Sequence, residues 1–327
     1  MKAVRAVIAG AGVMGRWHAQ AARRAGATVV GVVDPDLARA TRIARGSGAF
    51  DSLAAALHHS IDVVHVCTPL ATHFALCQQA LAAGCHVIVE KPVTPTADEA
   101  IALTAAAHAA GRILVPVHQF AFQRGVQSMR EHWAELGTIR HLEFATCSAG
   151  ALHKDASERD AVVAEIVPHP LSLARNLLGI SVSELAWQLQ RPAPGEWRFG
   201  ASTAGGAAIS GLVSMSARPT FASLRVLAEH GSVVADLFHG FAIFEGGRAS
   251  RGYKIVRPLA VGVRGTGIAL GNLVRRAVDG ESAYPGLRAL CAATYAAIDG
   301  SSSAPFAANE IVDVARARDQ LIALASS

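Results

Sequence analysis

The chain has 327 residues, of which 51% are hydrophobic and only 17% are charged, so its composition excludes a disordered protein and provides apolar surface for about two domains. The formal net charge is +5 at pH 7, but the basic residues are spread along the chain and aromatic residues make up only 6%, which argues against nucleic-acid binding. No apolar run reaches the roughly 18 residues of a membrane-spanning helix, and the five cysteines lack a C-x-x-C spacing, so we expect a soluble cytoplasmic protein without disulfides or membrane contact.

The first 118 residues alternate between short β-branched runs and alanine-rich segments with helical spacing. Strands are expected at 4–9, 28–33, 61–67, 86–90 and 113–117. Helices are expected near 13–25, 36–45, 51–59, 72–83 and 97–110. Apolar strands separated by helices are typical of a parallel sheet that is covered on both faces. The sequence therefore predicts a doubly wound α/β domain over residues 1–119.

The pattern changes after residue 120, where most strands follow one another without intervening helices. Strands are expected at 139–148, 183–190, 207–216, 221–229, 232–238 and 241–245. Helices are expected at 124–135, 170–178, 285–298 and 309–325, with a long loop at 257–272. Consecutive strands joined by short turns indicate an antiparallel or mixed sheet. Residues 120–327 are therefore predicted to form an α+β domain on one large, open, mostly antiparallel sheet.

A glycine-rich motif, Gly10-Ala11-Gly12-Val13-Met14-Gly15, follows the first predicted strand and opens the first predicted helix. In such a turn the first glycine permits the tight bend, the second lets the backbone approach a pyrophosphate, and the third allows close helix packing. Free N–H groups at the helix N-terminus then favour negative charge. We therefore expect Gly10, Gly12, Val13, Met14 and Gly15 to bind a dinucleotide cofactor.

Asp34 ends the second predicted strand, 19 residues after Gly15. A carboxylate at this position can bond the adenosine ribose hydroxyls and repels a 2′-phosphate, which favours NAD over NADP. Pro35 suits a first helical position, so Asp34 could also cap the second helix.

Further motifs carry a family resemblance. They are Cys67-Thr68-Pro69 with His73, the segment 83–92 (AGCHVIVEKP), Leu136-Gly137-Thr138-Ile139, Pro168-His169-Pro170-Leu171 and residues 229–233. Together with the glycine motif they resemble the glucose–fructose oxidoreductase/inositol dehydrogenase/MocA (Gfo/Idh/MocA) family, strongly to about residue 145 and loosely after about residue 180. The Glu-Lys-Pro triplet at 90–92 is the family's most specific mark.

This resemblance implies an NAD(P)-dependent oxidoreductase with a Rossmann domain and a sheet domain that supports both substrate binding and self-association. Family substrates are mostly sugars, cyclitols and their derivatives. The resemblance also places Cys67, Thr68, Pro69, His73 and Glu90 at the cofactor. We accordingly expect a homodimer or homotetramer formed through the C-terminal sheet.

Lys91 is one of only four lysines among 30 basic residues, and it follows the strand expected at 86–90. Ligands of open parallel sheets bind at the carboxyl ends of the strands. An ammonium there can bind cofactor and polarise a substrate oxygen. The alternative is a solvated loop lysine, which is the usual environment of this residue. Glu90 is expected beside Lys91 or the cofactor, or as a surface charge at the strand end.

His169 is the expected proton carrier, because it lies at a predicted helix N-terminus between Pro168 and Pro170, where the helix dipole disfavours the imidazolium form. The resemblance places it on the family's catalytic histidine. The family's usual aspartates are replaced by Glu165, four residues before it, and Ser172, three residues after it. In a continuous helix Glu165 could orient His169, or it could be an ordinary first-turn acid.

His118 ends the fifth predicted strand and is a further candidate for substrate binding, whereas His73 and His118 could each be structural. No histidine has metal-binding spacing to neighbouring Cys, Asp or Glu, so we expect no metal. The leading prediction is hydride transfer between NAD and a secondary alcohol or ketone of a sugar-like substrate, with Lys91 as electrophile and His169 as acid/base. The alternatives are reduction of a C=N or conjugated C=C bond on a less polar metabolite, and a non-catalytic NAD-binding sensor or assembly protein.

Overall fold

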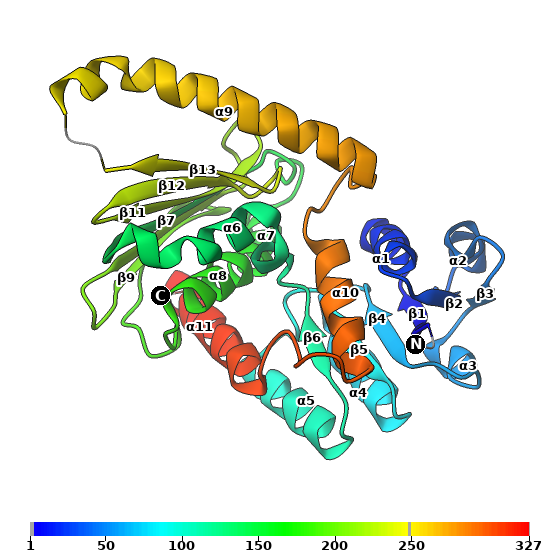
Figure 1. The fold of residues 1–327 in the computed structure, drawn as a ribbon. Coiled ribbons are helices and arrows are strands. Elements are labelled where there is room, and N and C mark those ends of the chain that lie inside the picture. Colours follow the sequence, from blue (N-terminus) through cyan, green and yellow to red (C-terminus); the bar gives the residue numbers. More distant parts are fainter. Residues whose placement is uncertain (1–2, 248–249, 327) are drawn as a thin grey trace. The chain divides into compact units, whose positions relative to one another are not determined.

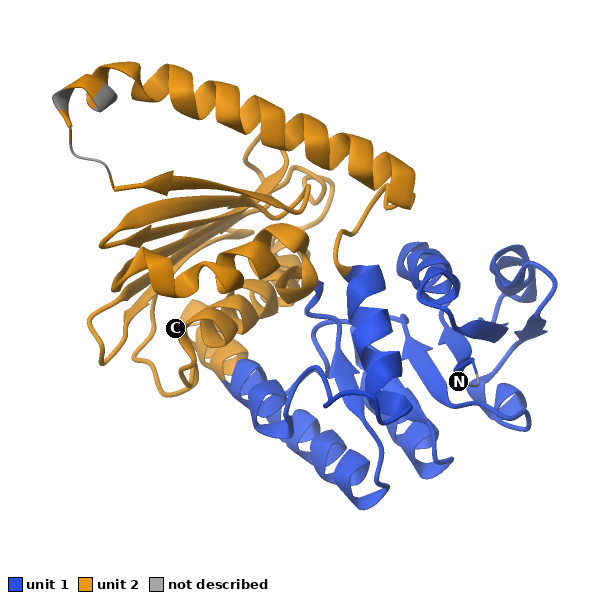
Figure 2. Cartoon of the chain, in the orientation of Figure 1, with its two compact units in different colours: residues 1–119, 287–316 blue, residues 120–286, 317–327 orange. Residues whose placement is uncertain are grey.

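The computed structural model describes residues 3–247 and 250–326, and the chain divides into two compact units (Figure 2). Unit 1 consists of residues 1–119 and 287–316, and unit 2 of residues 120–286 and 317–327. The break at 119/120 coincides with the boundary expected from the sequence. Residues 287–316, which the sequence pattern assigned to the second domain, belong to unit 1.

Unit 1 contains a six-stranded parallel sheet in the order β3-β2-β1-β4-β5-β6 (Figure 1). Its strands are β1 (Arg5–Ala9), β2 (Thr28–Val33), β3 (Gly48–Phe50), β4 (Val63–Val66), β5 (His86–Val89) and β6 (Leu114–Pro116). Strand β3 was not predicted, because three half-buried residues are too short to show a period. Strand β1 pairs with both β2 and β4, so the strand order reverses there. Ligands of such sheets bind at this reversal.

Helices cover both faces of this sheet. They are α1 (Val13–Arg24), α2 (Leu37–Ala44), α3 (Leu53–Ala56), η1 (Leu70–Thr72), α4 (His73–Ala82), α5 (Ala97–Ala109) and α10 (Leu287–Ile298). Helix α10 packs on α1, and α4 packs on α5 on the other face of the sheet. Helix α10 also reaches β4, where the Tyr295 hydroxyl lies 2.8 Å from His65 Nε2. These contacts explain why a segment late in the sequence belongs to unit 1.

Unit 2 contains a seven-stranded sheet in the order β13-β12-β11-β7-β10-β9-β8. Its strands are β7 (Ile139–Cys147), β8 (Gln188–Ala193), β9 (Glu196–Ser202), β10 (Ala208–Ser214), β11 (Phe221–Ala228), β12 (Gly231–Asp236) and β13 (Phe241–Gly246). Strand β10 runs parallel to β7, and every other neighbouring pair is antiparallel. The mixed, mostly antiparallel sheet confirms the predicted class of the second half.

The helices of unit 2 include two that the sequence reading missed. All the described helices of unit 2 are α6 (Arg124–Glu131), η3 (Trp133–Leu136), α7 (Ala156–Ile166), α8 (Pro168–Leu178) and α9 (Arg251–Asp279). Two more, η2 (Gln119–Phe122) and α11 (Ala308–Ser326), have residues in both units. Helix α7 was not predicted. The single strand expected at 183–190 is also wrong, because β8 begins only at Gln188 and is followed by β9.

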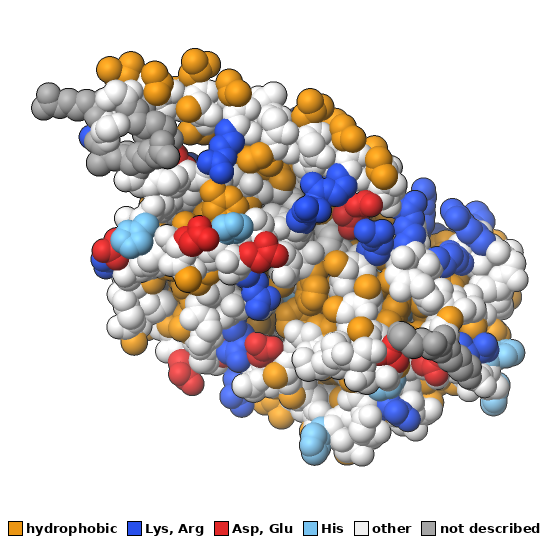
Figure 3. All heavy atoms as spheres, in the orientation of Figure 1, with side chains coloured by type: hydrophobic (Ala, Val, Ile, Leu, Met, Phe, Trp, Pro, Cys, Tyr) orange, Lys and Arg blue, Asp and Glu red, His pale blue; other side chains and the backbone are white. Residues whose placement is uncertain are grey.

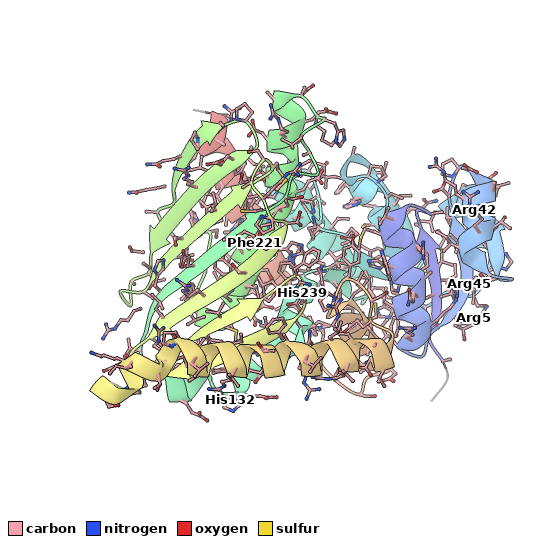
Figure 4. The ribbon with its side chains drawn as sticks, turned by 90° about the horizontal axis from the view of Figure 1, so that it is seen from above. Arg5, Arg42, Arg45, His132, Phe221 and His239 are labelled. Atoms are coloured by element: carbon pink, nitrogen blue, oxygen red, sulfur yellow. The ribbon has the colours of Figure 1, made fainter. Side chains whose placement is uncertain are left out.

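The expected loop at 257–272 is wrong as well, because these residues lie inside the 29-residue helix α9. Glycines and Pro258 within the segment hide its helical period. The helix docks on β13 and on the turn before it, where the Asn272 side-chain amide donates to the His239 carbonyl at 3.1 Å (Figure 4). Within the described ranges 3–247 and 250–326, no helix has the length and apolar character needed to cross a membrane.

Candidate functional site

The turn between β1 and α1 has a geometry that only glycine permits at two positions. Gly10 has a φ of +101°, and a Cβ on it would lie 2.6 Å from the Cys67 carbonyl oxygen. A Cβ on Gly15 would lie 1.7 Å from the Gly10 carbonyl oxygen. Around Gly12, by contrast, no described heavy atom lies within 4 Å of such a Cβ. Open space in front of the α1 N-terminus is what a cofactor pyrophosphate requires.

Asp34, which follows β2 directly, forms a hydrogen bond with the same turn. Its Oδ2 accepts a hydrogen bond from the Ala11 N–H at 2.8 Å, and its Oδ1 accepts one from the Asp36 N–H at 2.9 Å. The N-cap of α2 is Asp36, whose carboxylate accepts from the Ala38 and Arg39 N–H groups. The suggestion that Asp34 caps this helix is therefore wrong, and its carboxylate lies against the glycine turn instead.

An arginine-lined groove of about 460 Å³ adjoins the turn at Gly12 and Val13. The guanidinium groups around it belong to Arg16, Arg23, Arg39, Arg42 and Arg45. Basic side chains gather over α1 and α2 in Figure 3, and Arg42 and Arg45 are labelled in Figure 4. The sequence reading missed this cluster, although three of the arginines recur every third residue along α2 and its C-cap. The groove gives the glycine turn a positive surrounding, which suits phosphate groups.

His73 connects the turns that follow β4 and β5. Its Nε2 lies 2.9 Å from the Thr68 carbonyl oxygen, and its Nδ1 lies 2.9 Å from the Pro92 carbonyl oxygen. The imidazole is 2% exposed, so both ring nitrogens are occupied by the protein. His73 therefore positions the Cys67-Thr68-Pro69 turn relative to the Lys91-Pro92 turn.

Glu90 and Lys91 follow β5 directly. Glu90 is 7% exposed, and its Oε1 lies 2.9 Å from His18 Nε2 while its Oε2 accepts from the Lys91 N–H at 3.3 Å. Burial alone would raise the pKa of Glu90, but the hydrogen bond and charge of His18, together with the charge of Lys91, lower it below its usual value. Glu90 is therefore a buried carboxylate rather than a surface charge at the strand end.

His118 follows β6 and is also buried. Burial, assisted by the charge of Lys91 and opposed by that of Glu90, lowers the pKa of His118 to about 3, so the ring is neutral. It packs edge-to-face on Phe306 with 5.6 Å between centroids. Its Nδ1 has no hydrogen-bond partner among the described residues. A buried imidazole nitrogen in this condition is suited to meet a ligand atom.

In unit 2, His169 lies in the first turn of α8, directly after Pro168. Its ring is 8% exposed and stacks on Phe120, with 4.2 Å between centroids and 20° between planes. Glu165 lies near the end of α7, and Val167, in helical conformation, joins the two helices. The sequence reading missed the buried Arg318, whose Nε donates to the Ala164 carbonyl at 2.9 Å and whose charge acts on Glu165.

The expected residues of the N-terminal domain thus gather at the carboxyl ends of β1, β2, β4, β5 and β6, while His169 and Glu165 lie in unit 2. Buried groups behind Glu90, namely His18, His65 and Tyr295, escaped the sequence reading because they are far apart in the chain. Within the part of the chain that the structure describes, no three His, Cys, Asp or Glu side chains are placed to hold a metal ion. All five cysteines are buried and unbridged.

Residues 4–118 match the family model described as "Oxidoreductase family, NAD-binding Rossmann fold", the Gfo/Idh/MocA model. Residues 4–118 are a Gfo/Idh/MocA NAD-binding domain. The glycine turn, Asp34 and the Glu-Lys-Pro triplet all lie within the matched range.

Two curated relatives extend this assignment. The chain is 33% identical over 178 residues to a UDP-N-acetylglucosamine 3-dehydrogenase of Acidithiobacillus ferrooxidans, covering 54% of this chain and 55% of the relative. It is 32% identical over 203 residues to an inositol 2-dehydrogenase of Saccharopolyspora erythraea, covering 56% of each. The matched region spans about half the length of these curated relatives.

Solved structures share the fold along the whole chain. The Acidithiobacillus ferrooxidans UDP-N-acetylglucosamine 3-dehydrogenase GnnA superposes with a TM-score of 0.77 at 21% identity, covering 100% of this chain and 99% of GnnA. The WlbA dehydrogenase of Bordetella pertussis, solved in complex with NADH and UDP-GlcNAcA, superposes with a TM-score of 0.76 at 17% identity, covering 99% and 96%. At these identities the likeness establishes the architecture of both sheets.

Proposed function

We propose that this protein is an NAD-dependent oxidoreductase that interconverts a secondary alcohol and a ketone on a sugar, cyclitol or related substrate. One observation carries the proposal: an NAD-binding domain of an oxidoreductase family places Lys91 beside the buried carboxylate Glu90 at the end of β5, within electrostatic reach of neutral His118. The names of the relatives, dehydrogenases of an amino sugar nucleotide and of inositol, support the substrate class.

The residues of the β1–α1 turn fit the cofactor. Gly12 faces open space at the start of α1, where the pyrophosphate would lie, and the Asp34 carboxylate stands where the ribose hydroxyls would bond. Arg16 and the other groove arginines add positive charge nearby. When bound, NAD supplies the acceptor or donor for the hydride. All other steps fall to side chains of this chain.

In the oxidation direction, the carbinol C–H bond breaks with its electron pair leaving as hydride, and the O–H bond breaks with its proton leaving to His169. Lys91 stabilises the oxygen as negative charge develops on it. Phe120 stacks on His169 and fixes the plane of its ring, and Glu165, whose charge acts on Arg318, is the candidate to orient it further.

The proposal is tested by measuring NADH and NADPH binding from nicotinamide fluorescence and then assaying turnover with sugars, inositols, UDP-linked amino sugars, imines and conjugated enones. We expect submicromolar to micromolar NADH binding and turnover in the sugar or cyclitol group. Turnover confined to imines or enones would favour the C=N or C=C reductase. Cofactor binding without turnover in any group would favour the sensor.

Cofactor choice gives a second test at Asp34. Replacing Asp34 by Ala removes the acceptor for the ribose hydroxyls and the repulsion of a 2′-phosphate, so we expect NADH to bind about tenfold more weakly while NADPH binds as well or better. The matched control is Asp36→Ala, which removes the α2 cap and lowers thermal stability without changing the NADH-to-NADPH ratio. An unchanged ratio in Asp34→Ala would remove this residue from cofactor recognition.

A further inference from the structure

A chain of buried polar side chains runs inward from Glu90 through unit 1. His18, in α1, places its Nε2 2.9 Å from Glu90 Oε1 and its Nδ1 2.9 Å from His65 Nδ1. His65, in β4, places its Nε2 2.8 Å from the Tyr295 hydroxyl of α10. His18 and His65 are 0% exposed and Tyr295 is 5% exposed. Three elements far apart in the sequence thus converge on one carboxylate.

One hydrogen-bond pattern that fits these distances starts at Tyr295, the group farthest from Glu90. A phenol hydroxyl of Tyr295 that donates to His65 Nε2 leaves His65 with its proton on Nδ1. That N–H then donates to His18 Nδ1, which leaves the His18 proton on Nε2, where it donates to the Glu90 carboxylate. Every bond in this pattern points toward Glu90. Burial and then the charge of His18 lower the pKa of His65 well below its usual value, which agrees with a neutral His65.

Four further groups around Glu90 are neutral. Burial, reinforced by the charge of Glu90, raises the pKa of Cys67 in the β4–η1 turn and that of Cys291 in α10, the latter to about 12. Burial raises the pKa of Tyr295. His118, after β6, is neutral as described above. Glu90, His18 and Lys91 are therefore the groups that can carry charge at this end of the sheet.

The position of Glu90 in the sheet relates it to one half of the cofactor. Asp34 follows β2 directly and is the residue proposed to bind the adenosine ribose, and the strand order reverses between β1 and β4. A dinucleotide that crosses the carboxyl edge from β2 past this reversal has its nicotinamide half at the ends of β4 and β5. Glu90 follows β5. The oxidised ring carries one positive charge and the reduced ring carries none, so a fixed carboxylate there distinguishes the two redox forms.

We propose that Glu90 sets the preference of this protein for oxidised over reduced NAD, and that His18, His65 and Tyr295 are positioning residues that hold its carboxylate ionised and oriented. This inference rests on the proposed cofactor binding and extends it to the redox balance of the bound pair. The charge favours NAD⁺, which makes bound NADH a stronger reductant than free NADH. Without the Tyr295 hydroxyl, the hydrogen-bonded row of His65 and His18 would hold Glu90 less firmly in its ionised form.

The test compares dissociation constants of NAD⁺ and NADH, measured by calorimetry and by fluorescence between pH 5 and pH 9. In Glu90→Gln we expect the ratio of the NAD⁺ constant to the NADH constant to rise about tenfold or more, because a single charge at close range acts on only one redox form. In the unmodified protein we expect no rise of this ratio from Glu90 between pH 9 and pH 5, because the lowered pKa of Glu90 keeps its carboxylate ionised over this range.

The positioning role is tested with Tyr295→Phe against Thr294→Val. Thr294 is the neighbouring residue on α10, is 0% exposed, and its hydroxyl bonds only the Leu290 carbonyl in the described structure. Both substitutions delete one buried hydroxyl from the same helix and should lower the thermal midpoint similarly. Only Tyr295→Phe is expected to make the ratio of the NAD⁺ constant to the NADH constant rise toward pH 5, because a less firmly held Glu90 carboxylate protonates at higher pH.

The outcomes separate this inference from the proposed function. If neither NAD⁺ nor NADH binds the unmodified protein, the proposed function is overturned. If both bind, but the ratio is the same in Glu90→Gln as in the unmodified protein, the charge-based preference is overturned while the dehydrogenase assignment stands. If Tyr295→Phe and Thr294→Val share one pH profile, the positioning role of the buried chain is overturned.

Discussion

Lys91 lies beside a buried carboxylate that lowers the cost of keeping its ammonium at the end of β5. Replacing Lys91 by Ala is expected to slow hydride transfer at least about a hundredfold, by analogy with the loss of one donor to a developing oxyanion. Single-turnover absorbance at the NADH band measures this step directly. Lys154→Ala is the matched control, because Lys154 pairs only with Glu158 at 3.7 Å on α7 in the described structure. A loss below threefold in Lys91→Ala would exclude this residue from the mechanism.

The roles of single residues differ in whether the local sequence pattern can predict them. Asp34 and the three glycines were predicted from their spacing to bind the cofactor, and in the structure the Asp34 carboxylate accepts from the Ala11 N–H within the glycine turn. The role of His18 was not predicted, because no neighbouring residue in the sequence indicates that His65 and Glu90 lie next to it in the fold. The contacts of both His73 ring nitrogens with backbone carbonyls were not predicted either, because these carbonyls belong to two turns that come together only in the folded sheet.

Among the structural elements, the β1–α1 turn contains two glycines whose surroundings differ: a Cβ on Gly15 would clash with the protein, and a Cβ on Gly12 would not. Gly15→Ala would drive a methyl group into the Gly10 carbonyl and must displace α1, so we expect a lower thermal midpoint and little NADH binding. Gly12→Ala meets no described atom, so it should fold normally yet bind NADH at least about tenfold more weakly, because its methyl group occupies the space for the pyrophosphate. Circular dichroism and fluorescence titration measure the two effects. Equal behaviour of the two variants would contradict this division of roles.

Helix α9 shows the limit of periodicity at the element scale. Its large apolar side chains face outward over much of its length, with Leu259 72% and Val278 82% exposed. A helix whose apolar stripe does not face its own core, and which contains glycines and Pro258, gives no amphipathic signal toward the sheet. The row of hydrophobic side chains along it is visible in Figure 3.

At the scale of the whole molecule, buried neutral histidines make stability depend on pH. The pKa of His65 is well below its usual value and that of His118 is about 3, so below about pH 6.5 the unfolded chain binds more protons than the folded one. Glu90, with its lowered pKa, loses its contribution as the pH falls further. We expect the thermal midpoint to be constant above pH 7 and to fall steadily toward pH 4.

The matched variant for this prediction is His118→Gln, which removes one titrating ring from the folded interior. Its thermal midpoint, followed by circular dichroism, should fall less steeply between pH 6.5 and pH 4 than that of the unmodified protein. Parallel curves would show that His118 titrates alike in the folded and unfolded chains.

We further propose self-association through the outer face of the unit 2 sheet, where Leu227 on β11 and Val234 on β12 are 41% and 39% exposed. Light scattering should give at least twice the mass of one chain. Val234→Glu is expected to shift the protein toward monomer, whereas Leu37→Glu, at an apolar residue 48% exposed on α2, should not. A monomer in the unmodified protein would overturn this proposal.

The sequence by itself determined the local features: the alternation that builds the parallel sheet, the glycine turn, the acid at the end of β2 and the Glu-Lys-Pro triplet. These depend on neighbours in the chain and on spacing of a few residues. Long-range packing determines that α10 packs on α1, that five arginines line one groove, and that His18, His65 and Tyr295 converge on Glu90. The physical reason is that burial and hydrogen bonding act between surfaces, and chain position does not report which distant surfaces will meet.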